Sequence, residues 1–465
     1  MKAPLKAKTE VEPVNRKQQW KTILKIAWPL VIANGFWNLQ LTIDRLFLAN
    51  YSTETLGAAM AVMGIFWTPM ALLQQTAAYL TTFVAQYFGA RRLEMIGPSL
   101  WQSIYVSVIG GLLVLLFIPF ADRFFTFIGH PESTRVLEVK YFVAICYSAL
   151  PTALVAAASA FFTGLGHTRI IIRINVVGLV ANALLDYLLI PGTLGIPAYG
   201  ISGAGYATAL ANVFAAAYGL YLVFTKSHEK TYKVLSAWRY DPDLMKRFLK
   251  YGLPSGMQWA LEGLAFSVFL ILIGRMTNGS SALAASGIVV TVMMLTILPG
   301  LGVAQAVSVL VGQHLGEKNP GQAEVSAWSG LQVALMYIIP VGLSFILFPE
   351  FYLRWFHNAD DPAMWQQVAV IVPWLLMYVG LFTAFDCMNL VFSFALKGAG
   401  DTRFVTLVAL VIPWPLMVVP TWLLIDHPHA VYGAWAAASV YIVLQSIIFW
   451  RRFVGGKWKQ MTVMG

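Results

Sequence analysis

Long apolar stretches recur along the whole chain, and they constrain the fold more than any other feature of the sequence. Each of twelve such stretches is long enough to cross a hydrocarbon core of about 30 Å as a helix of about 20 residues. A bilayer offers no water to unpaired backbone groups, so spanning segments of this kind are helical. The expected spans are 23–49, 55–83, 98–121, 139–163, 170–190, 201–224, 248–274, 282–311, 325–349, 364–396, 404–425 and 431–450. The sequence therefore predicts an all-α integral membrane protein with twelve transmembrane helices.

The composition excludes an ordinary soluble protein. Of the 465 residues, 58% are hydrophobic and only 11% are charged, whereas a soluble domain carries about 25% charged residues. Both cysteines, Cys146 and Cys387, lie in apolar stretches, so we interpret them as buried small hydrophobic residues rather than as a disulfide. The seven histidines lie in loops or at span ends without metal-ligand spacing, which argues against an integral-membrane enzyme.

The net charge of +10 is distributed as in a membrane protein rather than as in a nucleic-acid-binding surface. With the N-terminus inside, 25 of the 31 Lys and Arg residues fall on the cytoplasmic side, and the positive-inside rule then places both termini in the cytoplasm. Residues 1–22 are polar and lack the apolar core of a signal peptide. The sequence predicts a multi-pass protein of the plasma membrane, or of the inner membrane in a Gram-negative bacterium, with no nucleic-acid partner.

The two halves of the chain resemble each other at an offset of about 230 residues. Gln86-Tyr-Phe-Gly89 matches Gln313-His-Leu-Gly316, and Gly164-Leu-Gly-His-Thr-Arg169 matches Gly398-Ala-Gly-Asp-Thr-Arg403. Six spans per half give both halves the same orientation, so we expect two lobes related by a pseudo-two-fold axis along the membrane normal, with a cavity between them. Such repeats are typical of secondary transporters, and the alternative is a non-transporting scaffold. The expected parts are a cytoplasmic leader (1–22), an N-lobe (23–225), a cytoplasmic inter-lobe loop (226–247), a C-lobe (248–453) and a cytoplasmic tail (454–465).

Four acidic residues, Asp44, Asp186, Glu262 and Asp386, lie inside the apolar stretches. A carboxylate at membrane depth costs about 2.5–3.5 kcal/mol even on mild insertion scales, so each one needs a cavity, a partner or a proton. By residue count, Asp44 and Asp186 lie in the outward half of the N-lobe, and Glu262 and Asp386 lie near mid-depth in the C-lobe. Two neighbouring carboxylates in a low-dielectric cavity do not both ionise readily, so each pair is suited to exchange a proton or to bind Na⁺. The alternative for Asp44 and Asp186 is hydration at the outer interface.

Polar and aromatic residues accompany the acids on the same spans. Asn182 lies one helical turn before Asp186, where it either hydrogen-bonds the acidic pair or makes a plain interhelical contact. Aromatic and methionine side chains near the carboxylates are suited to line a cavity for planar cations, although most such residues in membrane proteins pack or face lipid. The candidate substrate-binding residues are Trp37, Gln40, Met257, Gln258, Trp259, Phe382 and Asn389.

Taken in order along the twelve spans, the motifs resemble the NorM-like branch of the MATE (multidrug and toxic compound extrusion) family of antiporters. The resemblance runs from about Lys25 to Trp450 and includes Ile43-Asp-Arg-Leu-Phe-Leu-Ala49, Asn182-Ala-Leu-Leu-Asp-Tyr187 and Leu396-Lys-Gly-Ala-Gly-Asp401. It implies that Asp44, Asn182 and Asp186 match the polar residues of the family's first and fifth helices. Glu262 and Asp386 match the seventh- and tenth-helix acids of the NorM-type branch.

This resemblance implies secondary active efflux of amphipathic, cationic drugs or metabolites by a monomer that exchanges them for H⁺ or Na⁺ and uses no cofactor. Na⁺ would be expected at Glu262 and Asp386. Many NorM-type proteins have Tyr where this chain has Phe382, and the missing hydroxyl favours H⁺. The alternative is a lipid-linked oligosaccharide flippase of the same superfamily. A flippase cavity should be ringed by Arg and Lys, whereas the charges expected at membrane depth here are acidic.

Overall fold

The first half of the chain forms six membrane-spanning segments. The computed structural model describes residues 16–356 and 362–465, and within these ranges every regular element is a helix. The six segments are α1 (Arg16–Tyr51), α2 with α3 (Thr53–Ala78 and Leu80–Gly89), α4 (Ile96–Leu115), α6 with α7 (Glu132–Cys146 and Ala149–Gly164), α8 (Arg169–Leu189) and α9 (Ile201–Val223). Two short helices, α5 (Ala121–Ile128) and α10 (Lys226–Tyr232), lie in the connections.

The second half repeats this order. Its segments are α11 (Pro242–Gly274), α12 (Gly279–Gly316), α13 (Pro320–Leu347), α15 (Pro362–Ala399), α16 with α17 (Thr402–Val411 and Val419–Leu423) and α18 (Ala430–Val454), with the short α14 (Pro349–Leu353) after α13. A π-helical turn, Trp414–Val418, joins α16 to α17. Pro413, Pro415 and Pro420 lie in or next to this turn, and each removes a backbone donor from the helical ladder.

The number of spans agrees with the sequence prediction. Ten segments are long and apolar enough to cross a membrane, and the α6–α7 pair, bent by 40°, makes eleven. Helix α1 is the twelfth, since its 36 residues exceed the needed length although amide and charged side chains lower its hydropathy. It begins at Arg16, inside the stretch expected to be a leader. Residues 1–15 of that leader lie outside the described part of the chain.

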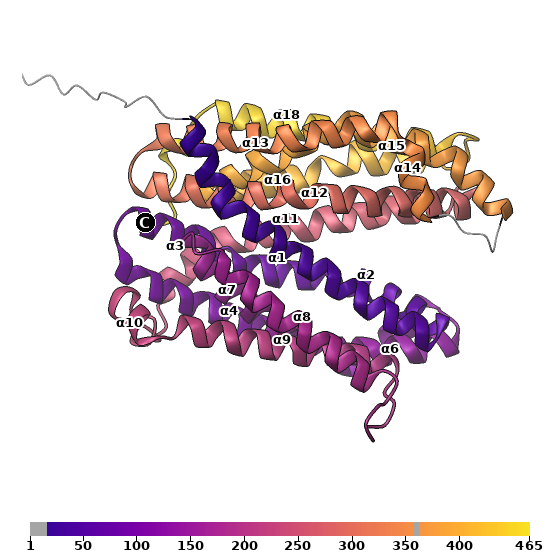
Figure 1. The fold of residues 1–465 in the computed structure, drawn as a ribbon, viewed down its shortest axis with the longest axis horizontal. Helices are drawn as coiled ribbons and strands as arrows, with labels where there is room; N and C mark the ends of the chain where they lie inside the picture. Colours follow the sequence, from indigo (N-terminus) through magenta and orange to yellow (C-terminus); the bar gives the residue numbers. More distant parts are fainter. Residues whose placement is uncertain (1–15, 357–361) are drawn as a thin grey trace, which may run out of the picture.

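The two halves form lobes that converge at one end of the bundle (Figure 1). At the converging end a single hydrophobic core joins both halves and contains Phe83 of α3, Phe248 of α11 and Phe392 of α15. At the other end each half has a separate core, one including Phe125 and the other including Trp435. The lobes are therefore joined at one end and separated at the other.

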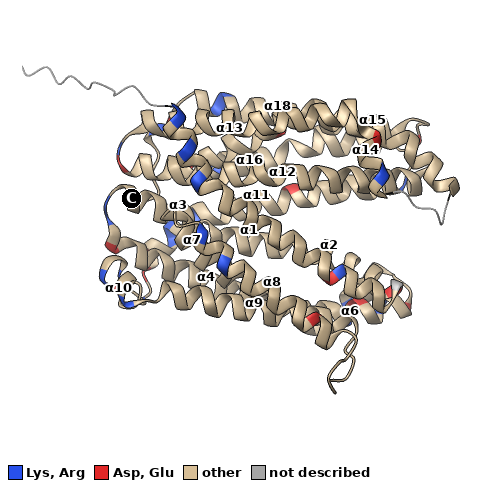
Figure 2. Cartoon of the chain, in the orientation of Figure 1, with Lys and Arg blue, Asp and Glu red and all other residues tan. Residues whose placement is uncertain are grey.

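The duplicated motifs meet at the converging end. Gly89 lies against the backbone carbonyl of Gln313, and Gly316 lies against that of Gln86. A Cβ atom on either glycine would overlap the neighbouring backbone, so these positions require the smallest residue. The reciprocal contact is the pseudo-two-fold relationship expected from the repeat. Lys and Arg side chains gather at this end of the molecule (Figure 2), which we call the basic end, and we call the opposite end the open end.

Candidate functional site

A cavity of about 690 Å³ lies between the lobes toward the open end, and we call it the outer chamber. Its walls come from α1, α2 and α6 of the first half and from α11, α12, α15 and α18 of the second. Three of the predicted acids, Asp44, Glu262 and Asp386, line it, and Asp186 does not. Among the described residues of this wall, the only other charged side chain is Arg45. Carboxylates therefore outnumber cations in the outer chamber.

Most of the predicted substrate-binding residues also lie on this wall, which is otherwise rich in aromatic and methionine side chains. The structure places there Trp37, Gln258, Trp259, Phe382 and Asn389. Trp37 and Trp67 lie with their ring centroids 5.3 Å apart. The methionines of the wall are Met60, Met63, Met293, Met294 and Met417. Such a surface offers dispersion and cation–π contacts to a planar ligand.

Gln40 and Met257, in contrast, line neither this chamber nor the one described below. Met257 is adjacent in sequence to Gln258, but one residue along a helix turns the side chain by about 100°. These two residues were chosen because they lie on the same spans as the predicted acids, and a position on a span does not fix the direction in which its side chain points. The structure does not bring them to the site.

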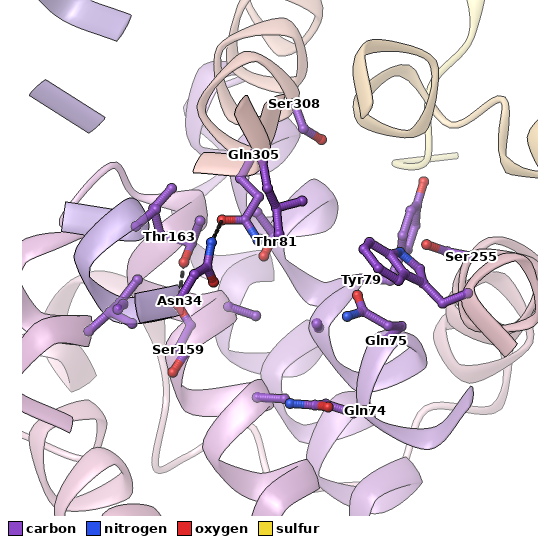
Figure 3. A pocket seen from close by; sticks show the side chains of 18 of the residues that line it. Asn34, Gln74, Gln75, Tyr79, Thr81, Ser159, Thr163, Ser255, Gln305 and Ser308 are labelled. Atoms are coloured by element: carbon purple, nitrogen blue, oxygen red, sulfur yellow. Dashed lines mark hydrogen bonds between the residues drawn. The ribbon is translucent and has the colours of Figure 1, made fainter. Parts of the chain in front are cut away.

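A second cavity, of about 300 Å³, lies toward the basic end, and we call it the inner chamber (Figure 3). It shares Trp37, Trp67, Trp259 and Phe394 with the wall of the outer chamber, so the two chambers adjoin. Its wall carries amide and hydroxyl groups, namely those of Asn34, Gln74, Gln75, Tyr79, Ser159, Ser255, Gln305 and Ser308. Asn34 of α1 donates to the Gln305 side-chain oxygen of α12 at 3.3 Å, which links the two lobes across the chamber.

Glu262 is held by a network of amides from neighbouring helices. Gln258 donates to its Oε1 atom at 3.3 Å from the same helix, and Gln445 of α18 donates to the same atom at 3.1 Å. Asn389 of α15 in turn donates to the Gln445 side-chain oxygen at 3.5 Å. Tyr441 of α18 lies close to both Glu262 and Asp386. Three helices of the C-lobe, α11, α15 and α18, therefore contribute to the network around Glu262.

Asp44 and Asp186 lie together with Asn182 and Thr208 in a cluster between α1, α8 and α9. Thr208 donates to one Asp44 oxygen at 3.4 Å. Among the described residues, no hydrogen-bond partner is found for the other Asp44 oxygen, for either Asp186 oxygen or for either amide atom of Asn182. All three residues are buried, and their four unpaired oxygens outnumber the one unpaired amide nitrogen, so this cluster has more hydrogen-bond acceptors than donors.

Other buried acids of the chain have a basic side chain close by. Glu138 lies 2.7 Å from His130 Nδ1, and Asp401 accepts two hydrogen bonds from Arg452 at 2.7 and 3.3 Å. In the described part of the chain, no Lys, Arg or His nitrogen lies within ion-pair distance of the four predicted acids. The absence of partner cations distinguishes these four carboxylates from structural ion pairs.

Several residues of the site were not found from the sequence. Gln445 and Tyr441 were overlooked, although a lone glutamine inside the apolar stretch 431–450 is itself a signal. Thr208 ends the motif Gly203-Ala-Gly-Tyr-Ala-Thr208, which also contributes to the resemblance. Lys397 was counted among the loop charges at the end of the tenth span, whereas the structure buries it in α15 on the wall of the inner chamber. The expectation of a loop position for Lys397 was wrong, because α15 extends to Ala399.

A multidentate metal site is not formed by the described residues, since no group of three or more His, Cys, Asp or Glu side chains lies close enough together. His357 falls outside the described ranges. Glu262 and Asp386 supply only two carboxylates, so further oxygen ligands would have to come from other groups if Na⁺ bound there.

Comparison with known proteins decides the family. The MatE family model matches residues 29–188 and 254–423, one segment in each lobe. The chain belongs to the MatE family. A probable multidrug resistance protein NorM of Thermotoga maritima is 24% identical over 448 residues, covering 96% of this chain and 94% of that protein. A protein of the same name from Shewanella oneidensis is 28% identical over 396 residues, covering 84% of each chain.

Solved structures show the same fold. A MOP superfamily transporter from Pyrococcus furiosus matches with a TM-score of 0.84 at 21% identity, over 95% of this chain and 97% of that one. An outward-facing MATE family transporter matches with a TM-score of 0.83 at 20% identity, with the same coverage. The family model and the NorM relatives identify this MatE protein as a membrane transporter rather than an enzyme, and the solved structures show that it has the two-lobed MATE fold.

Proposed function

We propose that this MatE protein exports amphipathic organic cations in exchange for H⁺, with Na⁺ as the alternative coupling ion. The observation that carries the proposal is the outer chamber, in which Asp44, Glu262 and Asp386 share a wall with aromatic rings and methionines. Its volume of about 690 Å³ lies within the range of about 300–1,000 Å³ typical of sites for drug-sized ligands. A cation in this chamber would meet carboxylates on both lobes. The names of the NorM relatives support the same class of cargo.

We assign the basic end to the cytoplasm, because Lys and Arg are enriched in cytoplasmic loops of membrane proteins (Figure 2). The shared core and the reciprocal Gly89 and Gly316 contacts then close the cytoplasmic side, and the chamber lies toward the outside. This corresponds to a state that releases cargo and accepts the coupling ion. To take up cargo from the cytoplasm, the lobes must separate at the basic end.

The donor-poor cluster of Asp44, Asp186 and Asn182 is the proposed coupling site. A proton held between the two carboxylates would remove one buried charge and supply a missing hydrogen-bond donor. Asp44 also lines the outer chamber, so the charge of this cluster interacts electrostatically with a cation bound there. Proton binding on the outside would thus favour release of a cation.

The C-lobe acids are the proposed cargo site. Gln258 and Gln445 both direct amide donors at Glu262, an arrangement that orients a carboxylate as an acceptor for a cation. Lys397 and Arg45 are the two basic residues on the chamber walls that point toward a flippase. Two separate basic residues do not make the basic ring that a pyrophosphate group would need, whereas the outer chamber carries three acids.

The test is transport of a fluorescent cation, the methyl ester of a carboxy-rhodamine, in proteoliposomes under an imposed pH or Na⁺ gradient. We expect transport driven by the pH gradient, and its loss in Asp44→Asn and Asp186→Asn. Glu262→Gln and Asp386→Asn should weaken dye binding. Transport that persisted in all four variants would refute the mechanism, and accumulation driven only by Na⁺ would replace the proton as coupling ion.

A further inference from the structure

Lys397 is a buried cation without a counter-ion. Its side chain is only 4% exposed. The ammonium lies 3.8 Å from the ring centroid of Phe394 and 5.7 Å from that of Trp259. In the described chain no carboxylate lies within ion-pair distance of it, although Glu262 acts on it from farther away. Lysines are almost never fully buried unless they are paired, and ring contacts replace only part of the lost hydration.

Lys397 lines the inner chamber, and it is the only charged residue among the described residues of that wall. No Asp or Glu occurs among the described residues that line this chamber. The groups facing the same space include the amides of Gln74, Gln75 and Asn34 and the hydroxyl of Ser255, all neutral hydrogen-bonding groups. A cavity with one ammonium and several neutral donors is chemically suited to a small anionic group such as a carboxylate.

The charges of the two adjoining chambers are therefore of opposite sign. The outer chamber carries Glu262 and Asp386, and the inner chamber carries Lys397. Trp37, Trp67 and Trp259 border both chambers and lie between the two charged regions. A ligand that reached from one chamber to the other would meet acids, then aromatic rings, then an ammonium.

We propose that the inner chamber is a carboxylate subsite, with Lys397 as its anchor, for zwitterionic cargo whose cationic end lies against Glu262 and Asp386. The planar body of such a molecule would lie among the three shared tryptophans. The inference rests on the proposed function in one respect, since it assigns the cationic end of the cargo to the outer chamber. It adds a second recognition element of opposite charge, which selects zwitterions over simple cations.

A matched pair of dyes tests the subsite: a carboxy-rhodamine with a free carboxylate, and its methyl ester. Their binding to the purified protein is measured by dye fluorescence anisotropy in Lys397→Met and Lys397→Arg. A hydrogen bond to a charged group is worth about 1.5–3 kcal/mol, so Lys397→Met should weaken the free acid by about tenfold or more. The ester should change by less than about twofold on the same scale. Lys397→Arg keeps the charge and should retain the preference for the free acid.

Lys250 provides the matched control. Its ammonium also lies over an aromatic ring, 5.2 Å from that of Tyr251, but it lines neither chamber. Lys250→Met should leave both dyes unaffected. An equal loss of both dyes in Lys397→Met, or no loss of either, overturns the subsite. Retained ester binding in that variant shows that the protein is folded.

Transport separates this inference from the proposed function. If the wild-type protein moves the ester under an ion gradient but Lys397→Met weakens binding of both dyes equally, or of neither, only the subsite fails. If the protein moves neither dye but binds the free acid through Lys397, the subsite stands and the exchange mechanism fails.

Discussion

The side-chain amide of Gln86 donates a hydrogen bond to the backbone carbonyl of Gly398, 3.0 Å away on the opposite lobe. Gln313, its counterpart in the repeat, donates to the carbonyl of Gly164 at 2.9 Å. Each glutamine thus binds the first glycine of the other half's Gly-x-Gly segment. The motifs that revealed the duplication in the sequence are the ones that close the basic end, and they do so reciprocally.

Replacing Gln86 by Ala should loosen this closure. The change leaves the Gly398 carbonyl without its donor, and an unsatisfied buried group costs about 1–3 kcal/mol. Because the bond exists only when the basic end is closed, we expect the closed population to fall by about tenfold relative to the open one. Arg91 and Lys318 are exposed positions that follow the two motifs. Spin labels attached at Arg91→Cys and Lys318→Cys report the distance between the lobes at the basic end by double electron–electron resonance. The native Cys146 and Cys387 are buried.

Gln102 is the control for that experiment. It is equally buried, but its amide donates to the Pro98 carbonyl of its own helix at 3.3 Å and does not cross the lobes. Gln102→Ala should leave the label distances unchanged. Identical distance distributions for Gln86→Ala and Gln102→Ala would show that the inter-lobe bond does not control closure.

The segment after α18 adds a second tie across the basic end. Thr462 Oγ1 and the Val463 amide both donate to Gln86 Oε1, at 3.1 and 2.9 Å, while Tyr251 of the C-lobe donates to the Thr462 carbonyl at 3.4 Å. Thr462→Val removes one of these bonds, worth about 0.5–1.5 kcal/mol, so amide exchange of residues 456–465 should accelerate about two- to tenfold. Hydrogen–deuterium exchange followed by mass spectrometry measures this rate.

Thr22→Val is its matched control, since the Thr22 hydroxyl donates only to the Gln18 carbonyl within α1, at 3.1 Å. If exchange in 456–465 is as slow in Thr462→Val as in Thr22→Val, the segment is held by its apolar contacts alone. Val463 and Trp458, both fully buried, would be the source of those contacts.

The fold and much of the site could be predicted from the sequence because both depend on the large free-energy cost of exposing backbone polar groups or charged side chains to the hydrocarbon core. Apolar runs of spanning length must be helices, and acids within them are costly enough to indicate a cavity. Asp44, Glu262 and Asp386 were found in this way and do line one chamber.

The remainder depends on how helices are rotated and paired, which periodicity alone does not give. Gln445 reaches Glu262 from a helix 183 positions away in sequence. Gln40 lies on the same helix as Trp37 and Asp44 but does not reach the chamber that both of them line. Lys397 lies one residue beyond the expected end of the tenth span at residue 396, and only packing against Phe394 and Trp259 shows that it is buried. Contacts and side-chain directions of this kind are set by how the helices pack against one another.

Asp186→Asn should stabilise the protein while it abolishes proton-driven transport. The substitution replaces an ionisable group at a fully buried position by a neutral one, and it supplies an amide donor to a cluster in which unpaired acceptors outnumber donors. Removing such a penalty is expected to raise stability by about 1–3 kcal/mol, seen as an increase in Tm in detergent. The transport assay is the pH-gradient uptake of the rhodamine ester.

Asp401→Asn is the contrasting variant, because Asp401 already accepts two hydrogen bonds from Arg452. Its neutralisation leaves a half-buried guanidinium with a weaker partner and should lower Tm. A lower Tm for Asp186→Asn as well would show that the ionised carboxylate is satisfied in the native protein, contrary to the coupling role assigned to its cluster.

Gln445→Ala should weaken binding of the cationic ester without affecting the proton-coupling cluster. Gln445 donates to Glu262 at 3.1 Å, and loss of a hydrogen bond to a charged group corresponds to about 1.5–3 kcal/mol, or a rise of about tenfold or more in Kd. Gln40→Ala is the control, because that glutamine lines neither chamber. Anisotropy titrations give both Kd values. If Gln40→Ala weakened binding as much as Gln445→Ala, the cargo would lie nearer to α1 than to the Glu262 network. The roles proposed for the two acid pairs, coupling for Asp44 and Asp186 and cargo binding for Glu262 and Asp386, would then be exchanged.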